Sequence, residues 1–109
     1  MEIPERLSLA ELQRYVDWLE ADRGFSDQTI LDKCLLLGEE VGELFKAVRK
    51  SSGLAVDETS TFGEVGDELA DVLIFLASIA NRAGVDLDHA LRTKEAVNRT
   101  RTWRPDHSM

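Results

Sequence analysis

Apolar residues recur every three to four positions in four segments of the chain, as they do on the buried face of an α-helix. No segment shows the strict alternation of apolar and polar residues that is typical of a strand. The pattern therefore predicts an all-α fold, in which residues 1–109 form a single four-helix bundle-like domain.

Capping residues indicate where the helices begin. Two of them, Ser8 and Thr61, are followed three residues later by Glu11 and Glu64, which is the spacing of a capping box. The expected caps, in chain order, are Ser8, Ser26 or Asp27, Thr61 and Asp86. The helices are expected to end near Asp22, Lys50, Arg82 and Asn98, with Gly24 and Gly84 directly after the first and third.

An eight-residue pattern occurs twice, at residues 37–44 and 65–72. Both copies read apolar, Gly, acid, acid, apolar, small, acid, apolar, so each places two acids three residues apart on one face of a helix. If the two helices pack together, four carboxylates share a small volume. They belong to Glu40, Glu43, Glu68 and Asp71.

Crowded carboxylates repel one another and resist ionisation. A hard divalent cation such as Mg²⁺ relieves the repulsion, because it prefers oxygen ligands and keeps positions open for substrate phosphates. A solvated acidic face is the alternative. In both copies, however, the acids border the apolar stripe, which favours a metal site.

Small residues form a stripe on each of the two motif helices. One runs Cys34, Gly38, Gly42 and the other Gly63, Gly66, Ala70, Ala77. Glycine inside a helix costs roughly 1 kcal/mol relative to alanine. The stripes therefore predict close packing of these helices, either within the chain or across a dimer.

Composition narrows the function classes. The net charge of −8 argues against binding to nucleic acid or to an anionic membrane surface. The single cysteine excludes an intrachain disulfide, no signal peptide is visible, and the longest apolar run is too short to span a bilayer, so a cytoplasmic location is expected. A chain of 109 residues buries a modest core, which makes a homodimer or homotetramer plausible.

Basic and aromatic residues are candidates for nucleotide contacts. Five basic residues lie late in the chain, where they either match a helix dipole or clamp phosphates; they are Arg92, Lys94, Arg99, Arg101 and Arg104. Lys33 lies seven residues before Glu40 and hence on its face, where it could offset acidic charge or reach a phosphate. Trp18 is a candidate for base stacking, as are Tyr15 and Trp103, although core packing is the commoner role of such residues.

These motifs resemble a known family. The segments LLLGEEVGELFKAV and GDELADVLIFL are similar to the MazG-type nucleoside triphosphate pyrophosphohydrolases of the all-α NTP pyrophosphatase superfamily. The spacing Lys94-x-x-x-Asn98-x-x-Arg101-x-Trp103 is similar to the end of that family's fourth helix, and the resemblance extends from about Leu12 to Trp103. Dimeric dUTPases, dCTP pyrophosphatases and phosphoribosyl-ATP pyrophosphatases share the acid motif.

The resemblance implies Mg²⁺-dependent hydrolysis of a nucleoside triphosphate between the α and β phosphates, with Mn²⁺ as a possible substitute. It implies that Glu40, Glu43, Glu68 and Asp71 are the metal ligands and that Glu39 is the catalytic residue, a carboxylate in the outer shell or one that orients water. Lys94, Asn98 and Arg101 would contact the nucleotide. The preferred base and sugar stay open.

Two other functions are considered. One is a non-catalytic regulatory bundle that binds metal and nucleotide, although the basic residues near Lys94 and Arg101 exceed what a metal buffer needs. The other is a di-iron carboxylate bundle, which requires Glu-x-x-His pairs. Neither His89 nor His107 occupies such a position.

Overall fold

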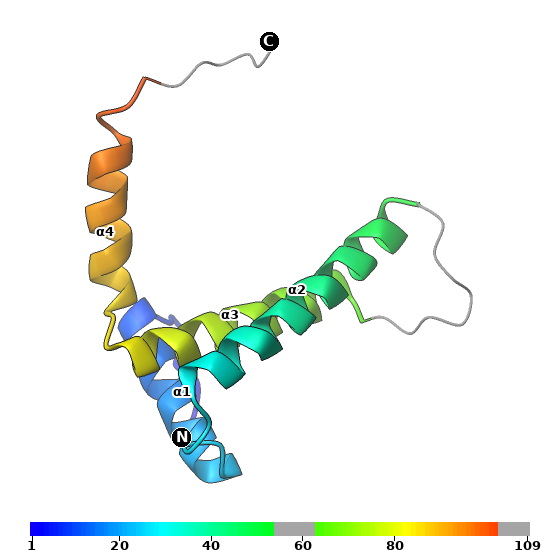
Figure 1. The fold of residues 1–109 in the computed structure, drawn as a ribbon, viewed down its shortest axis with the longest axis horizontal. Coiled ribbons are helices and arrows are strands. Elements are labelled where there is room, and N and C mark those ends of the chain that lie inside the picture. The colour runs from blue at the N-terminus through cyan, green and yellow to red at the C-terminus, as the bar shows by residue number, and fades with distance from the viewer. Residues whose placement is uncertain (54–62, 103–109) are drawn as a thin grey trace.

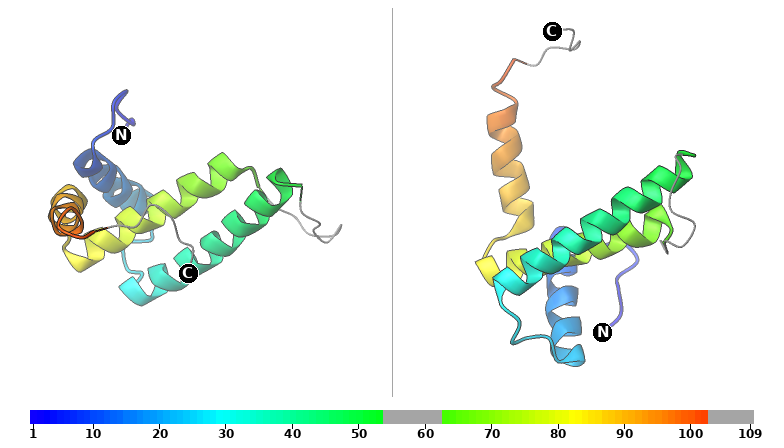
Figure 2. Two further views of the ribbon diagram at one scale, coloured as in Figure 1. Left: turned by 90° about the horizontal axis from the view of Figure 1, so that it is seen from above. Right: turned by 45° about the vertical axis from the view of Figure 1, so that its right-hand side comes forward.

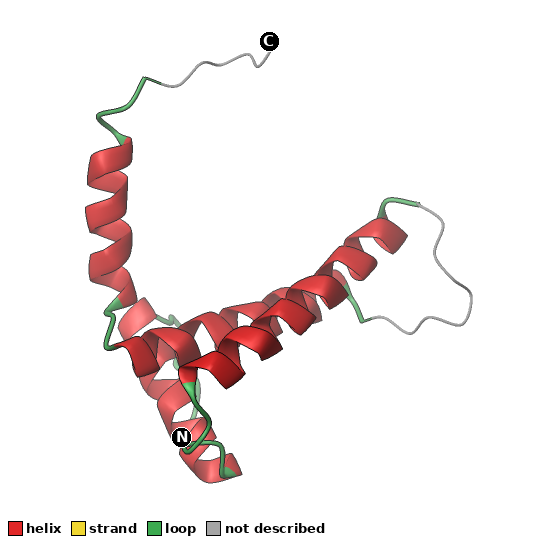
Figure 3. Ribbon diagram, viewed as in Figure 1, coloured by secondary structure: helices red, strands yellow, loops and turns green. Residues whose placement is uncertain are grey.

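The computed structural model describes residues 1–53 and 63–102. Four helices make up the fold: α1 (Leu9–Arg23), α2 (Ile30–Ser51), α3 (Val65–Ala83) and α4 (Leu87–Asn98). The described part of the chain contains no strand (Figure 3), which confirms the all-α prediction. None of its helices combines the length and the apolar character needed to cross a membrane.

The helix ends follow the sequence signals closely, and the starts follow them in two cases of four. Ser8 forms the predicted capping box with Glu11, and the Asp86 side chain accepts a hydrogen bond from the backbone of α4. The helices end within one residue of the predicted positions, and Gly24 and Gly84 take left-handed φ values of 77° and 68°. Glycine adopts that conformation without the strain that a Cβ would add.

Two predicted starts are wrong. Thr29, rather than Ser26 or Asp27, caps α2, and Asp32 completes a capping box with it. The Asp32 side chain accepts a hydrogen bond from the N-cap backbone, a role that glutamate or glutamine usually has in a capping box. Helix α3 begins at Val65 with Glu64 as its N-cap, so Glu64 is not the third residue of a box; Thr61 lies outside the described residues.

Helices α2 and α3 run antiparallel, and α1 crosses α3 near the end of this pair (Figures 1 and 2). The core lies at that crossing, where Leu12, Val16 and Leu19 of α1 surround the fully buried Ala77 of α3. Because α1 contributes three of these four residues, it covers one end of the α2–α3 pair and leaves the far end free.

Helix α4 leaves this assembly (Figure 1). It packs against α1, and its C-terminal half projects away from the α2–α3 pair. Gln13 of α1 fixes the turn before it, because its side chain donates to the carbonyl of Val85 at 2.8 Å and accepts from the N–H of Leu87 at 2.9 Å. The radius of gyration is 17.1 Å, against about 13 Å for a compact domain of this size. The four predicted helices are present, but a single chain does not close them into a bundle.

Apolar surface is exposed as a result. Several positions that the three-to-four-residue periodicity assigns to the interior are solvent-accessible in the single chain: Ile30, Cys34, Val48, Leu69 and Leu76. A Cβ added at Gly38, Gly42 or Gly66 would meet no atom within 4 Å. Close packing within the chain is therefore the wrong explanation for these three glycines, and packing across a dimer remains the prediction.

Candidate functional site

Three acidic side chains converge between α2 and α3. One carboxylate oxygen from each of Glu40, Glu68 and Asp71 lies within 4.8 Å of the other two. Glu40 comes from the first copy of the repeated pattern and the other two from the second, so the repeat does bring its acids together. These three carboxylates are named here the carboxylate group. Glu68 is buried and Asp71 is exposed, so the group has one side open to solvent.

The electrostatics of the carboxylate group centre on Glu40. Its pKa is raised by burial first, and then by the nearby negative charges of Asp71, Glu68 and Glu43. A raised carboxyl pKa means that the charged form is penalised in this position. The donor set consists of oxygen atoms alone, which fits a hard divalent cation such as Mg²⁺ or Mn²⁺.

Glu43 and Glu39 lie at the edge of this arrangement. Glu43 is one turn beyond Glu40, and its carboxylate is 3.6 Å from the ammonium of Lys46 rather than inside the carboxylate group. It is close enough for its charge to contribute to the raised pKa of Glu40. Glu39 is exposed on α2 beside Glu40 and lies outside the carboxylate group.

Gly63 contributes to the site because it has no side chain where the Glu68 carboxylate lies. A Cβ at this position would overlap the carboxylate of Glu68. The sequence pattern assigned Gly63 to a stripe for helix packing, whereas its neighbour in the structure is a candidate ligand. The absence of a side chain at residue 63 lets the backbone approach Glu68, and this role leaves no signature in sequence spacing alone.

Lys33 does not reach the carboxylate group. Its ammonium is 3.1 Å from a carboxylate oxygen of Glu20, and both side chains are almost fully buried. The rings of Phe25 and Phe75 flank the same ammonium at 5.2 and 5.5 Å. Of the two roles considered for Lys33, the structure shows charge compensation, directed at Glu20 rather than at the repeated acids.

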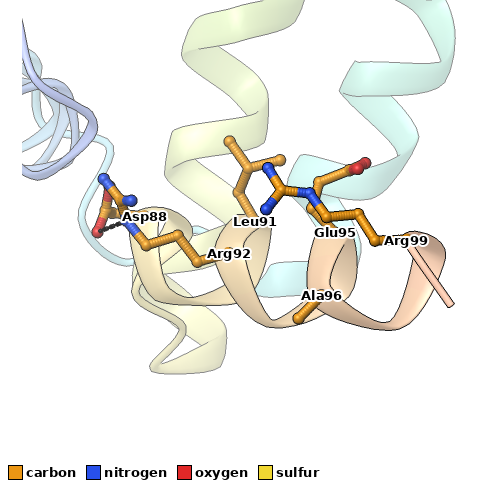
Figure 4. A pocket seen from close by; sticks show the side chains of 6 residues that line it. All are labelled: Asp88, Leu91, Arg92, Glu95, Ala96 and Arg99. Carbon is orange, nitrogen blue, oxygen red and sulfur yellow. Dashed lines mark hydrogen bonds and ion pairs between the residues drawn. The ribbon is translucent and has the colours of Figure 1, made fainter.

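Helix α4, which carries Lys94, and the residues that follow it, which include Arg101, project away from the α2–α3 pair of their own chain (Figure 1). Lys94 and Arg101 are exposed, and Asn98 donates to Glu95 at 3.2 Å. Figure 4 shows the neighbouring surface of α4, where Arg92 pairs with Asp88 at 3.0 Å along a shallow depression. Arg104 and Trp103 fall outside the described residues.

Trp18 lies on the outer side of α1. Its side chain is partly exposed, and its ring centroid is 5.8 Å from that of Tyr15 in a tilted arrangement. An exposed indole of this kind is available for a stacking contact.

Comparison with known proteins gives consistent matches. The family described as the MazG nucleotide pyrophosphohydrolase domain matches residues 28–102. A dATP/dGTP diphosphohydrolase of Salmonella phage PMBT28 is 35% identical over 97 residues, which cover 88% of this chain. The chain spans only 28% of the length of that phage protein.

Two solved structures share the fold. The iMazG protein from Vibrio DAT 722 superposes with a TM-score of 0.68 at 30% identity, covering 90% of this chain and 100% of that one. A Cyanophage S-2L MazG-like pyrophosphohydrolase superposes with a TM-score of 0.66 at 31% identity, covering 94% of this chain and 89% of that one. The cyanophage protein was solved with dGDP and three catalytic Mn²⁺ ions per active site.

Proposed function

The chain belongs to the MazG nucleotide pyrophosphohydrolase family, and from this premise we propose that it hydrolyses a nucleoside triphosphate between the α and β phosphates. The products would be a nucleoside monophosphate and pyrophosphate. The observation that carries the proposal is the meeting of Glu40, Glu68 and Asp71 within 4.8 Å. The phage relative's name supports a purine deoxynucleoside triphosphate as the substrate.

The proposed cofactor is Mg²⁺, with Mn²⁺ as a substitute. Glu40, Glu68 and Asp71 would hold it, and Glu43 would join them by leaving Lys46, which a partly exposed side chain can do at small cost. The manganese ions of the cyanophage relative support this assignment. Bound divalent cations neutralise phosphate charge and lower the pKa of a coordinated water.

The chain's own residues would supply positioning and proton transfer. Phosphoryl transfer depends on charge neutralisation and in-line geometry more than on covalent help from the protein. Glu39 is exposed beside Glu40, and we assign it the role of orienting the attacking water and accepting its proton. Trp18 would stack on the base. Lys33 would contact the nucleotide only after its ammonium left Glu20.

The active unit is proposed to be a homodimer or homotetramer. Helix α4, which carries Lys94 and Asn98, projects away from the α2–α3 pair of its own chain, and Arg101 follows its end, so we assign these residues to the carboxylate group of a second copy. Exposed leucines on α3, including Leu69, Leu73 and Leu76, provide apolar surface for such an assembly. A positive group brought to the phosphates in this way would stabilise charge that the cations do not reach.

A product-resolved assay tests the reaction. The protein is incubated with each ribo- and deoxynucleoside triphosphate and Mg²⁺, and the nucleotide and phosphate products are separated. Pyrophosphate and a monophosphate are expected, with loss of turnover in Glu68→Gln and retention in Asp67→Asn, an exposed neighbour outside the carboxylate group. A diphosphate with inorganic phosphate would contradict the cleavage position. Nucleotide binding without turnover would favour the regulatory bundle.

A further inference from the structure

A second polar cluster spans α1, α2 and α3, and it contributes no ligand to the carboxylate group. It consists of Glu20, Lys33, Ser78 and Arg82, named here the Glu20 cluster. Three of its members are almost fully buried, with exposed fractions of 4% for Glu20, 4% for Lys33 and 1% for Ser78. A charged network this deep is retained only when its members satisfy one another.

The Glu20 carboxylate is the centre of the network. The Ser78 hydroxyl donates to it at 3.0 Å, the Lys33 ammonium lies 3.1 Å from it, and the Arg82 guanidinium contacts both of its oxygens at 2.9 Å. Burial raises the pKa of Glu20, but its bonds to Arg82, Lys33 and Ser78 outweigh burial, and the net pKa lies below its ordinary value. The carboxylate is therefore ionised at neutral pH, where it pairs with the Lys33 ammonium and the Arg82 guanidinium.

The network joins three helices. Glu20 belongs to α1, Lys33 to α2, and Ser78 and Arg82 to α3. Arg82 also donates to the backbone carbonyls of Gln28 at 2.7 Å and Phe25 at 3.1 Å, and so holds the connection between α1 and α2. The cluster thereby fixes α2 against α3 both through side chains and through the backbone that leads into α2.

The spacing relates this cluster to the carboxylate group. Lys33 precedes Glu40 by seven residues on α2, and Ser78 follows Asp71 by seven residues on α3. Seven residues are two helical turns, or about 10.5 Å, on each helix. Because α2 and α3 run antiparallel, the Glu20 cluster and the carboxylate group both lie where these helices pack together. The distance between them along α2 equals the distance along α3.

A polar network selects one register, whereas apolar contacts tolerate several. Sliding α3 along α2 by one turn displaces its residues by about 5.4 Å. Because the Glu20–Lys33 ion pair holds α1 on α2, that shift would break the bonds of Ser78 and Arg82 to Glu20 and leave buried charges without partners. It also exceeds the 4.8 Å within which the three carboxylate oxygens meet. The register that satisfies the Glu20 cluster is therefore the register that assembles the carboxylate group.

We propose that the Glu20 cluster is a register pin, whose members are positioning residues that hold Glu40 opposite Glu68 and Asp71. The inference rests on the proposed function only in taking the carboxylate group to be the cation site. It assigns to Ser78 and Arg82 a role in cation affinity although neither residue contacts the cation.

Two measurements test the pin, and the first does not depend on catalysis. Nitroxides are attached to Cys34, the only cysteine of the chain and an exposed one, and to an introduced Ala70→Cys on α3. Distances are recorded by pulsed EPR with labelled chains diluted in unlabelled protein. In Arg82→Met the distance distribution is expected to broaden or to shift by at least one helical rise, about 1.5 Å. An unchanged distribution in a folded Arg82→Met protein would overturn the pin.

The second measurement is Mn²⁺ affinity of the unlabelled proteins. Arg82→Met is expected to bind Mn²⁺ about tenfold more weakly, comparable to the loss of an outer-shell partner. Val16→Ala is the matched control, because Val16 is fully buried in the α1 core outside the Glu20 cluster; it should lower the melting temperature and keep the affinity. Equal affinity in Arg82→Met and wild type at a lowered melting temperature would show that the cluster only stabilises the fold.

Two further outcomes stay informative. If Arg82→Met does not fold, Ser78→Ala takes its place in both measurements, because it removes the hydroxyl that donates to Glu20 and accepts from Arg82 without removing a charge. If the wild type lacks hydrolysis, the proposed function fails, and the distance distributions still decide for or against the pin.

Discussion

Neutralising Glu40 should make the metal-free protein more stable. Two unit charges 4.8 Å apart interact by about 3.5 kcal/mol at an effective dielectric constant of 20, and Glu40 faces both Glu68 and Asp71 at or below this separation. The exposure of Asp71 and the raised pKa of Glu40 both reduce the repulsion that is realised at neutral pH. For Glu40→Gln we therefore expect a gain of about 1–3 kcal/mol in the free energy of unfolding without metal.

The pH dependence has a definite sign. A carboxyl group whose folded pKa is raised contributes stability below its unfolded pKa, about 4.3 for glutamate, and loses that contribution as pH rises through the folded pKa. The difference in unfolding free energy between Glu40→Gln and wild type should therefore grow as pH rises from about 4 towards neutrality. A difference that stayed constant over this range would mean that charge repulsion is not its cause.

Metal should offset the greater stability of Glu40→Gln. A cation that binds only the folded state adds about 2.7 kcal/mol at a hundredfold excess over its dissociation constant. For a domain of this size, that corresponds to a rise of roughly 10–20 °C in melting temperature. Wild type should show this rise and Glu40→Gln only a small part of it.

The assay is a thermal melt followed by circular dichroism, at fixed protein concentration and matched ionic strength, with chelator and with Mn²⁺. Asp67→Asn is the control, since it removes one exposed charge next to Glu68 and leaves the carboxylate group intact. Equal Mn²⁺-induced rises in wild type and Glu40→Gln would refute the metal assignment and leave the acids as a solvated surface.

Three further predictions concern the geometry of the site. Gly63→Ala should weaken Mn²⁺ binding about tenfold with the helix content unchanged, because the new Cβ displaces Glu68; a titration giving wild-type affinity would contradict this. Light scattering should give at least a dimer at working concentration, and an active monomer would remove the proposed assembly. Mixing Lys94→Ala with Glu40→Gln should restore up to about a quarter of wild-type turnover, since a hybrid dimer carries one intact site; turnover no higher than the sum of the separate variants would rule out a site shared between copies.

The sequence predicts local structure well where the signal is local. The ends of α1 and α3 can be predicted from Gly24 and Gly84, because a residue just past a helix end often adopts a left-handed conformation that favours glycine. Three acids of the two acid-x-x-acid steps do meet, since a helix fixes which residues share a face, whereas Glu43 pairs with Lys46 instead. The α2 start was missed because Thr29 competes with Ser26 and Asp27, all of them good capping residues within four positions.

Exposure and long-range pairing could not be predicted from periodicity. An apolar stripe shows which face of a helix avoids water but not what covers it, and Leu69 and Leu76 remain uncovered in the single chain. Glu20 follows Leu19 and reads as the polar border of a stripe, although it is buried by partners 13, 58 and 62 residues away. Pairings of that range depend on how α1 crosses α3, which no local pattern specifies.

The ion pair between Lys33 and Glu20 keeps the Lys33 ammonium away from the metal site. Lys33 and Glu40 share a face of α2 two turns apart, and an ammonium directed along that face would lower the repulsion among the repeated acids. A carboxylate group with a built-in ammonium would bind a cation weakly, because the cation would have to displace a positive charge already in place. Glu20 holds Lys33 two turns away, in a network that Ser78 and Arg82 complete. Glu40 is left with a raised pKa among like charges, and the instability of that arrangement without metal is the free energy that a bound cation recovers.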